Sequence, residues 1–409
     1  MKHILIVGIG SQDNFKDRYI LSELAKLPYD IFIAKSASDN YWFKEYIKPT
    51  NVLSVDFSDI TNCIAQISYW CETNNIYFDA IFSFKEHMVA QASIIAQAFG
   101  CIHTSLNNIF SASNNKLLFR KRYNSIDSQD LIKTAITLLD KSNKLPVLKS
   151  SMVIKPLFGS SSCGVQQVLP GDNITSIIAD SKQAISNKFN VAHNRGFLLE
   201  NYIKGPAFSI DGIIQNNVIH FAGINEYMYG PLPYFVQTGN IIPASISRAQ
   251  TDFCKNAMRQ IIRHFGFNNT PFHAEVILNK DKMYLIEIAC RMPGGKIPRG
   301  YELAYGFSFV EQVTNLYLGL PVNFEHKTNF QIIQKGKHIF ENCIIESISL
   351  PKGIDTIQDF ALVTHEGERN QHPSNNKPVY FYTVQTDDLK SACIKCDEIE
   401  KSINIKTKQ

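Results

Sequence analysis

The sequence has few of the features that mark membrane-spanning, secreted or nucleic-acid-binding proteins. It contains no run of about 18 apolar residues, so we expect no transmembrane helix. The apolar run in the basic start MKHILIVGIG is short and lacks a small-residue cleavage site, which favours a buried first strand over a signal peptide. A net charge of +4 is small for 409 residues and argues against a protein dedicated to binding nucleic acid.

Cysteine is present but shows no framework of paired residues. The nine cysteines are odd in number and scattered, which is typical of reduced thiols in a cytoplasmic protein. Cys393 and Cys396 form one C-x-x-C pair, and no second pair completes a zinc site. We therefore interpret these two cysteines as thiols on the face of a helix.

Hydrophobic residues make up 44% of the chain, which is typical of a globular protein. A length of 409 residues predicts two to four domains, because a single core is unlikely at this size. In residues 1–105, buried strands alternate with helices, which predicts a doubly wound parallel α/β domain. The expected strands are 4–7, 31–34, 52–55 and 80–84, and the expected helices include 17–26, 58–73 and one that ends at Gly100. Gly8 and Gly10 lack the third glycine of a dinucleotide site, so they fit a tight βα turn better.

The rest of the chain divides into three further predicted domains. Residues 106–190 contain helices in NNKLLFRKRYN and DLIKTAITLLDK, followed by a strand and a Gly/Ser turn. Residues 191–320 are richer in strands and close with a helix near 309–318. Residues 321–409 alternate short strands with turns and end in one helix, which predicts a small α+β cap with a frayed basic tail, KTKQ.

Two acidic residues face each other if FHAEVILNKDKMYLIEIACR forms a β-hairpin. With a three-residue loop at 280–282, Glu275 lies directly opposite Glu287. Facing carboxylates repel each other, but a divalent cation such as Mg²⁺ binds carboxylate oxygens together with substrate phosphates. A two- or four-residue loop without a bulge would instead place the two carboxylates on opposite faces of the sheet.

Residues near this hairpin favour phosphoryl chemistry. Arg291 follows the second carboxylate, and Gly294 and Gly295 let a ligand approach the backbone. In VIKPLFGSSSCGV, Lys155 ends a strand and a small-residue turn exposes N–H groups to an anion, although such turns also occur in ordinary hairpins. In FLLENYIKGP, Glu200 and the backbone after it could hydrogen-bond adenine, although a plain strand and turn would read the same.

In their order along the chain, these motifs resemble the ATP-grasp family. The resemblance rests on Lys116 in NNKLLFR, Lys155 in VIKP, Glu200 in LLENYI, Glu275 in FHAEVIL, and Glu287 with Arg291 in LIEIACR. It implies an ATP-grasp fold, with ATP held between two α+β subdomains that follow the N-terminal α/β domain. It also implies an enzyme that ligates a carboxylate to an amine, with Mg²⁺, or alternatively Mn²⁺, as the metal cofactor.

The resemblance gives a role to each matching residue. Lys116 and Lys155 match phosphate-contacting lysines, and Arg291 matches an arginine near the transferred phosphoryl group. Glu275 and Glu287 match the magnesium ligands. Matches to the phosphate loop are Ser160, Ser161, Ser162 and Gly164, and matches to the adenine hinge are Glu200, Asn201, Tyr202 and Ile203. With Arg291, the backbone at Gly294 and Gly295 is expected to stabilise a tetrahedral intermediate.

Two positions depart from the family pattern. Many members hold ribose with a glutamate after the hinge Gly-Pro, where this chain has Ala207. Many also have asparagine two residues after the second metal glutamate, where this chain has Ala289. These departures weaken the implied ribose and metal contacts. They leave open a nucleotide-binding regulatory protein that has lost turnover.

Within the family, INEYMYGPLPYFVQTGNIIPASI looks most like ligases that join amino acids. The likeness suggests substrate-side roles for Glu226, Tyr234, Phe235, Gln237 and His273, although Tyr234, Phe235 and His273 fit ordinary core positions equally well. It implies an L-amino-acid (dipeptide) ligase with small-molecule carboxylate and amine partners, and with neither nucleic acid nor membrane as partner. A ligase for another carboxylate–amine pair, in nucleotide or natural-product biosynthesis, is the alternative. Homodimers are common in the family, and the oligomeric state of this chain stays open.

Overall fold

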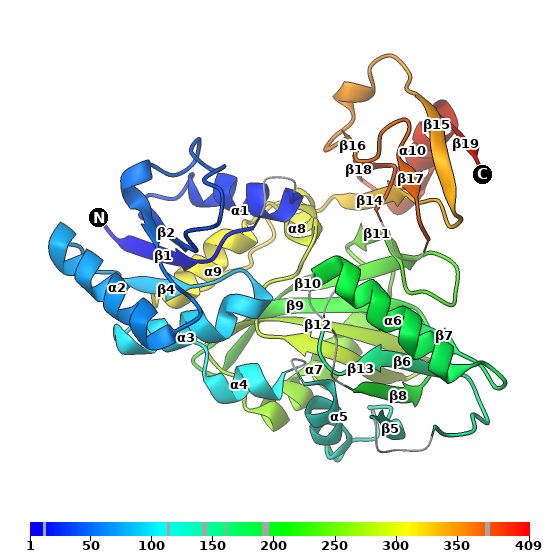
Figure 1. Ribbon diagram of the computed structural model, residues 1–409, viewed down its shortest axis with the longest axis horizontal. Coiled ribbons are helices and arrows are strands. Elements are labelled where there is room, and N and C mark those ends of the chain that lie inside the picture. The colour runs from blue at the N-terminus through cyan, green and yellow to red at the C-terminus, as the bar shows by residue number, and fades with distance from the viewer. Residues whose placement is uncertain (11–13, 113–114, 141–144, 160–161, 190–195, 373–376) are drawn as a thin grey trace.

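Figure 1 shows the computed structural model, which describes residues 1–10, 14–112, 115–140, 145–159, 162–189, 196–372 and 377–409. Strands in these residues form a four-stranded parallel sheet, a four-stranded antiparallel sheet, an eight-stranded antiparallel sheet and a three-stranded sheet. Every helix in this part of the chain is too short or too polar to span a bilayer. The predicted mixture of α/β and α+β structure is confirmed.

The N-terminal region is a parallel sheet of order β3-β2-β1-β4. Its strands are β1 (His3–Val7), β2 (Asp30–Lys35), β3 (Val52–Ser54) and β4 (Ala80–Phe82), close to the predicted ranges. In β1, Ile4 and Ile6 pack against α1 (Phe15–Leu24). Leu5 and Val7 point to the other face, which α2 (Ile60–Asn74) and α3 (Val89–Ala98) cover. Because helices cover both faces, the predicted doubly wound domain is confirmed.

A four-stranded antiparallel sheet carries the predicted phosphate loop. In sheet order its strands are β5 (Ile136–Leu139), β8 (Phe197–Asn201), β6 (Met152–Pro156) and β7 (Gln166–Val168). The helices near it are α4 (Leu106–Ser111), α5 (Lys116–Asn124) and α6 (Ile174–Phe189). Ile174 and Ile185 of α6 pack on Ile154 and Phe197, so this sheet has its own small core.

The helix predicted for DLIKTAITLLDK is wrong. Ile136–Leu139 forms β5 and pairs antiparallel with β8, with Ile136 opposite Glu200. A short apolar run fits either a helix or a strand by periodicity. Ile136 and Thr137 are β-branched, and the free edge of β8 offers backbone partners, so tertiary pairing decides for the strand.

The eight-stranded sheet has the order β13-β12-β9-β10-β11-β14-β18-β16. Its first five strands are β13 (Lys282–Ala289), β12 (Thr270–Asn279), β9 (Ala207–Gln215), β10 (Val218–Tyr229) and β11 (Gln237–Ile242). One face packs against α7 (Arg248–Phe265). The other packs against α8 (Ile297–Tyr305) and α9 (Phe309–Tyr317), the helix predicted near 309–318. Tyr317 of α9 also stacks on Phe82 of β4 at 4.7 Å between ring centroids, which docks the N-terminal sheet onto this core.

The C-terminal region continues the large sheet and adds a small one. Strands β14 (Gln331–Lys337), β18 (Tyr380–Thr386) and β16 (Ala361–Leu362) extend the large sheet beyond β11. Strands β17 (Arg369–Asn370), β15 (Cys343–Ser349) and β19 (Asn404–Lys408) form the three-stranded sheet, and α10 (Leu389–Ser402) packs beside them. As Figure 1 shows, this region rises from the rest of the molecule above β11. The boundaries between the four predicted domains stay predictions.

Two expectations for the C-terminal region can be compared with the structure. Cys393 and Cys396 lie on α10 as interpreted, the first exposed and the second buried. The expected frayed tail is wrong, because Lys406 and Lys408 belong to β19, which pairs antiparallel with β15. Ile403 and Ile405 pack on the C-terminal core, and the exposed residues after them are ordered by backbone pairing with β15.

Candidate active site

The predicted carboxylate pair faces across the β12–β13 hairpin. Glu275 lies opposite Glu287 in the strand register, as the even spacing predicted. The three-residue loop is wrong, because Asn279 pairs with Lys282 and leaves a two-residue turn. A bulge beside Glu275 adds one residue to β13 and restores the pairing.

The charges of the pair fit a divalent cation. Burial, together with Glu275 opposite, raises the pKa of Glu287 above its usual range. An oxygen-preferring cation such as Mg²⁺ would relieve this repulsion, and Mn²⁺ accepts similar ligands. Within the described residues, no cluster of three or more histidine, cysteine, aspartate or glutamate side chains could hold a metal. The remaining ligands would therefore be phosphate oxygens and water.

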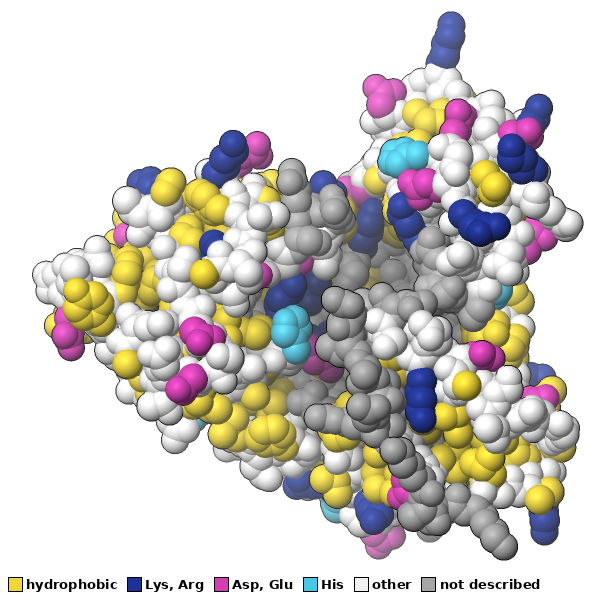
Figure 2. All heavy atoms as spheres, viewed as in Figure 1, with side chains coloured by type: hydrophobic (Ala, Val, Ile, Leu, Met, Phe, Trp, Pro, Cys, Tyr) yellow, Lys and Arg dark blue, Asp and Glu magenta, His cyan; other side chains and the backbone are white. Residues whose placement is uncertain are grey.

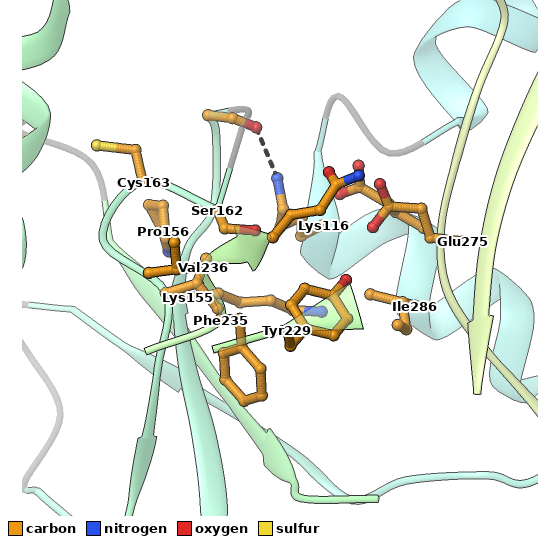
Figure 3. Close-up of a pocket in the computed structure, with 14 residues that line it drawn as sticks. Lys116, Lys155, Pro156, Ser162, Cys163, Tyr229, Phe235, Val236, Glu275 and Ile286 are labelled. Atoms are coloured by element: carbon orange, nitrogen blue, oxygen red, sulfur yellow. Dashed lines mark hydrogen bonds between the residues drawn. The ribbon is translucent and has the colours of Figure 1, made fainter. Parts of the chain in front are cut away.

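A cavity of about 310 Å³ lies beside the pair, and Figure 3 shows its lining. Lys116, Lys155, Glu275 and Glu287 all line it. A second cavity of about 270 Å³ has several lining residues in common with the first, among them Lys155, Tyr229 and Glu275. The second cavity reaches the predicted hinge residues, Glu200, Asn201, Tyr202 and Ile203. The structure thus brings the predicted phosphate, metal and hinge residues to adjoining cavities.

Lys116 and Lys155 reach the cavity from different elements. Lys116 is the first residue of α5, whose N-cap is Asn115, and its Nζ donates to the Gly159 carbonyl at 2.9 Å. Lys155 lies on β6, and its Nζ is 2.5 Å from Oε2 of Glu200. Burial, assisted by nearby Arg120, lowers the pKa of Lys155 to about 8 despite the opposing effect of Glu200.

Glu200 is surrounded by donors. Its carboxylate accepts hydrogen bonds from Arg120 Nε at 2.8 Å and from the Tyr284 hydroxyl at 2.9 Å, besides the contact with Lys155. Burial raises the pKa of Glu200, but the two cations outweigh it and hold the pKa at about 2. These donors occupy the Glu200 carboxylate. A nucleotide base in the second cavity would therefore form its hydrogen bonds with the hinge backbone.

Arg120 was missed by the sequence analysis. It is fully buried, and it donates to the backbone carbonyls of Leu285 at 2.6 Å and Ile286 at 2.9 Å. Through Glu200 it also contacts β8, so one guanidinium joins α5, the hinge strand and the strand that carries Glu287. Its position one helical turn after Lys116, on the same helix face, was the available signal.

The predicted phosphate loop is described only in part. Ser160 and Ser161 lie outside the described residues. Ser162 lines both cavities and has a φ of +51°. Gly164 has a φ of +72°, and a Cβ there would lie 3.0 Å from Ile185 of α6, so it serves the turn and its packing. Phosphate contact by this loop stays a prediction.

His273 contacts Glu275, one member of the carboxylate pair, and does not line either cavity. Its Nδ1 is 2.6 Å from Oδ1 of Asp211, and its Nε2 is 3.5 Å from Oε1 of Glu275. Burial lowers the pKa of His273, but Asp211 outweighs burial and raises it to about 9. Asp211 also accepts from the Tyr301 hydroxyl at 2.7 Å. Among the described contacts, His273 therefore orients Glu275, and a substrate role stays a prediction.

The other predicted substrate residues separate into two groups. Glu226 accepts from the Ser245 backbone at 2.9 Å and lines neither cavity. Phe235 lines both cavities. Gln237 lines the first cavity, and Tyr234 lines the second beside the hinge. In position, Tyr234 thus belongs to the hinge end of the site.

Arg291 joins the hairpin to the N-terminal region. Its Nε and Nη2 donate to Oε2 of Glu86 at 3.0 and 2.7 Å. Glu86 lies in the 3₁₀ turn η2 (Glu86–Met88) after β4, and no local sequence pattern indicates that it pairs with Arg291. Burial raises the pKa of Glu86, but Arg291 outweighs it and lowers the pKa. A Cβ at Gly294 or Gly295 would meet no atom within 4 Å, so there is room beside this backbone.

Figure 2 shows charged side chains of both signs gathered in the hollow between the N-terminal region and the rest of the molecule. The arrangement unites carboxylates that suit a metal, lysines that suit phosphates, and a hinge-lined cavity. Such a site suits a nucleoside triphosphate together with a divalent metal ion.

Comparisons with known proteins identify the fold of the chain. Residues 148–298 match the family model for an ATP-grasp domain. No curated protein sequence matches the chain. The structure is similar to L-amino acid ligase from Bacillus licheniformis, with a TM-score of 0.80 and 15% identity over 100% of this chain and 99% of that one.

Two further solved structures are similar over the whole chain. Phosphoribosylglycinamide synthetase from Anaerococcus prevotii gives a TM-score of 0.67 at 15% identity, covering 100% of both chains. N5-carboxyaminoimidazole ribonucleotide synthetase from Thermotoga maritima gives 0.65 at 15% identity, covering 99% of both. At these identities the likeness concerns the fold. The chain therefore has the ATP-grasp fold, with an ATP-grasp domain at residues 148–298, as its sequence motifs implied.

Proposed function

We propose that this protein is an ATP-dependent ligase that joins a carboxylate to an amine, with amino acids as the first substrates to test. The observation that carries the proposal is the Glu275–Glu287 pair, which faces a cavity that also contains Lys116 and Lys155. Two acids with two lysines suit a metal-bound triphosphate better than an uncharged ligand.

The nucleotide would extend over both cavities. Its base would lie in the second cavity, between the hinge and the aromatic side chains of Tyr234 and Phe235. Its phosphates would lie in the first cavity, near Lys116 and Lys155. Glu275 and Glu287 would hold Mg²⁺, which when bound neutralises phosphate charge and orients the triphosphate.

The chemical step would be displacement at the terminal phosphorus of ATP. A substrate carboxylate oxygen would attack the γ-phosphorus, and the bond to the β–γ bridging oxygen would break, giving ADP and an acyl phosphate. The amine would then attack the acyl carbon, and inorganic phosphate would leave with the proton lost from nitrogen. Arg291 and the backbone at Gly294 and Gly295 would stabilise the negative oxygen formed at that carbon.

An amino-acid substrate is supported by the motif likeness and by similarity in fold to an L-amino acid ligase. The fold similarity extends to synthetases of ribonucleotide-type substrates, which favours a second candidate, ligation of another carboxylate–amine pair. Both candidates need the same nucleotide site. They differ in the carboxylate and the amine that would bind next to Arg291.

The test uses the purified chain with ATP, Mg²⁺ and amino acids singly and in pairs. Phosphate release is measured, and products are identified by mass spectrometry. Turnover that needs two amino acids and yields a dipeptide supports the first candidate. Turnover with another carboxylate–amine pair supports the second. Nucleotide binding without turnover on amino acids or on other carboxylate–amine pairs would contradict a ligase and support a regulatory nucleotide-binding protein.

A further inference from the structure

Residues 230–236, named the pocket segment here, connect β10 to β11 and form part of the hinge-side cavity wall. Gly230, Leu232, Tyr234 and Phe235 all line that cavity. Phe235 packs against Tyr202 of the hinge, with ring centroids 6.4 Å apart. Figure 3 shows Phe235 beside Tyr229 at the site. The position of this segment therefore determines the width of the cavity proposed for the base.

On one side, the pocket segment is attached to the hairpin that carries the phosphate loop. The backbone N–H of Gln167 in β7 donates to the Pro233 carbonyl at 2.8 Å. Gln166 of β7 forms an antiparallel bridge with Tyr234. These contacts fix the segment relative to β6 and β7, which belong to the four-stranded antiparallel sheet.

On its other side, the pocket segment packs against two aromatic residues of the C-terminal region. A Cβ added to Gly230 would lie 2.3 Å from Cζ of Phe340, so that ring rests directly on the Gly230 backbone. The His372 ring meets Tyr234 edge-on, with centroids 5.1 Å apart. Phe340 and His372 also meet edge-on, at 5.6 Å.

The two aromatic residues are themselves held in place. The Asn370 side-chain amide donates to the carbonyls of Ile339 at 2.9 Å and Glu341 at 2.7 Å, on either side of Phe340. The His372 backbone N–H donates to Oδ1 of Asn342 at 2.9 Å. The C-terminal region thus presents Phe340 and His372 as a fixed support.

We propose that Phe340 and His372 are positioning residues for the base of the nucleotide, acting through Gly230 and Tyr234. The inference rests on the proposed function, because it concerns the hinge end of the same nucleotide site. Holding the pocket segment in place before binding lowers the ordering cost of closing the base pocket. Neither residue lines the cavities, so their effect passes through the segment.

The test measures ligand affinity of the full chain by calorimetry, with two probes. Mg²⁺–ADP occupies the base pocket and part of the phosphate site, whereas inorganic tripolyphosphate with Mg²⁺ occupies only the phosphate end. We expect Phe340→Ala and His372→Ala to weaken ADP binding by about tenfold and to leave tripolyphosphate binding unchanged. His372→Phe keeps an edge-on ring and should retain the ADP affinity of the wild type.

A double variant tests the contact itself. Gly230→Ala should weaken ADP binding, because its methyl group would overlap the Phe340 ring. In the Phe340→Ala background the same methyl group has room, so the double variant should bind ADP no worse than Phe340→Ala alone. Such non-additivity is expected only for residues in contact.

Phe360→Ala is the matched control, because Phe360 is another aromatic residue of the C-terminal region and stacks on Tyr380 at 6.0 Å. It should leave both affinities unchanged. Equal loss of ADP and tripolyphosphate binding in Phe340→Ala, or unchanged ADP binding, would overturn the inference while the proposed function stands. A wild-type chain that bound neither probe would overturn both.

Discussion

The hinge end and the metal end of the site handle charge in opposite ways. At the hinge end, the buried Arg120 and Lys155 surround Glu200, so the protein supplies its own counterions. At the metal end, Glu275 faces Glu287 in the strand register. The first arrangement already contains its counterions, whereas in the second the proposed cation would offset the repulsion between the two carboxylates. Substitutions at the hinge end should therefore affect folding first, and those at the metal end should affect turnover first.

The largest effect is expected at the metal end. Glu287→Ala should reduce ATP-dependent turnover to background, because it removes one of the two carboxylates proposed to hold the cation beside the triphosphate. The fold should persist, since the substitution also removes the repulsion from Glu275. ADP release and thermal unfolding measure the two effects. Asp281→Ala, at the exposed tip of the same hairpin, is the control, and near-normal ADP release by Glu287→Ala would refute the metal assignment.

The hinge end provides the opposite case. Arg120→Met should lower the free energy of unfolding by about 3–5 kcal/mol, because it leaves Glu200 buried with one counterion fewer. Urea unfolding measures this loss, and Lys121→Met on the exposed side of α5 is the control. If Arg120→Met lost turnover but kept its stability, the contrast between the two ends would be wrong.

Substitution of Arg291 tests the residue proposed to stabilise the negative oxygen formed at the acyl carbon. Arg291→Ala should lower the turnover rate by about 10²- to 10³-fold, comparable to the loss of one well-placed oxyanion donor. The substitution also breaks the pair with Glu86, so Glu86→Ala is needed as a control for the lost attachment. Steady-state kinetics at saturating ATP provides the comparison. An unchanged rate in Arg291→Ala would remove this residue from the chemistry.

The smallest expected effect is a pH dependence at the hinge end. The pKa of Glu200 is lowered from 4.5 to about 2 in the folded protein, so its contribution is fully present above about 4.5 and is lost as the pH falls towards 2. By pH 3, roughly 2 kcal/mol of stability should be lost through this group. Urea unfolding from pH 7 to pH 3 measures the slope. Glu200→Gln should flatten it, and Glu72→Gln, exposed on α2, should not.

The sequence predicted the parts of the site that local pattern encodes. Even spacing placed Glu275 opposite Glu287, although the loop length was wrong and a bulge compensated for it. The partners Arg120 and Glu86 were not predicted, because each meets its partner across 80 or 205 residues. Such contacts depend on how separate sheets dock, and periodicity carries no information about docking. The helix predicted over β5 failed for the same reason, since β8 supplied its partner.

Strand β14 carries a practical consequence for anyone who wishes to shorten this protein. It hydrogen-bonds to β11 from Gly239–Lys335 to Ile242–Ile332, within the same sheet that holds Glu275. A truncation near residue 320 would remove β14 and leave the backbone groups on that edge of β11 unpaired, while β10 would still pair with the other edge. An exposed edge strand can pair with strands of other molecules and cause aggregation. A shortened version should therefore keep β14 and β18, because their removal would favour aggregation.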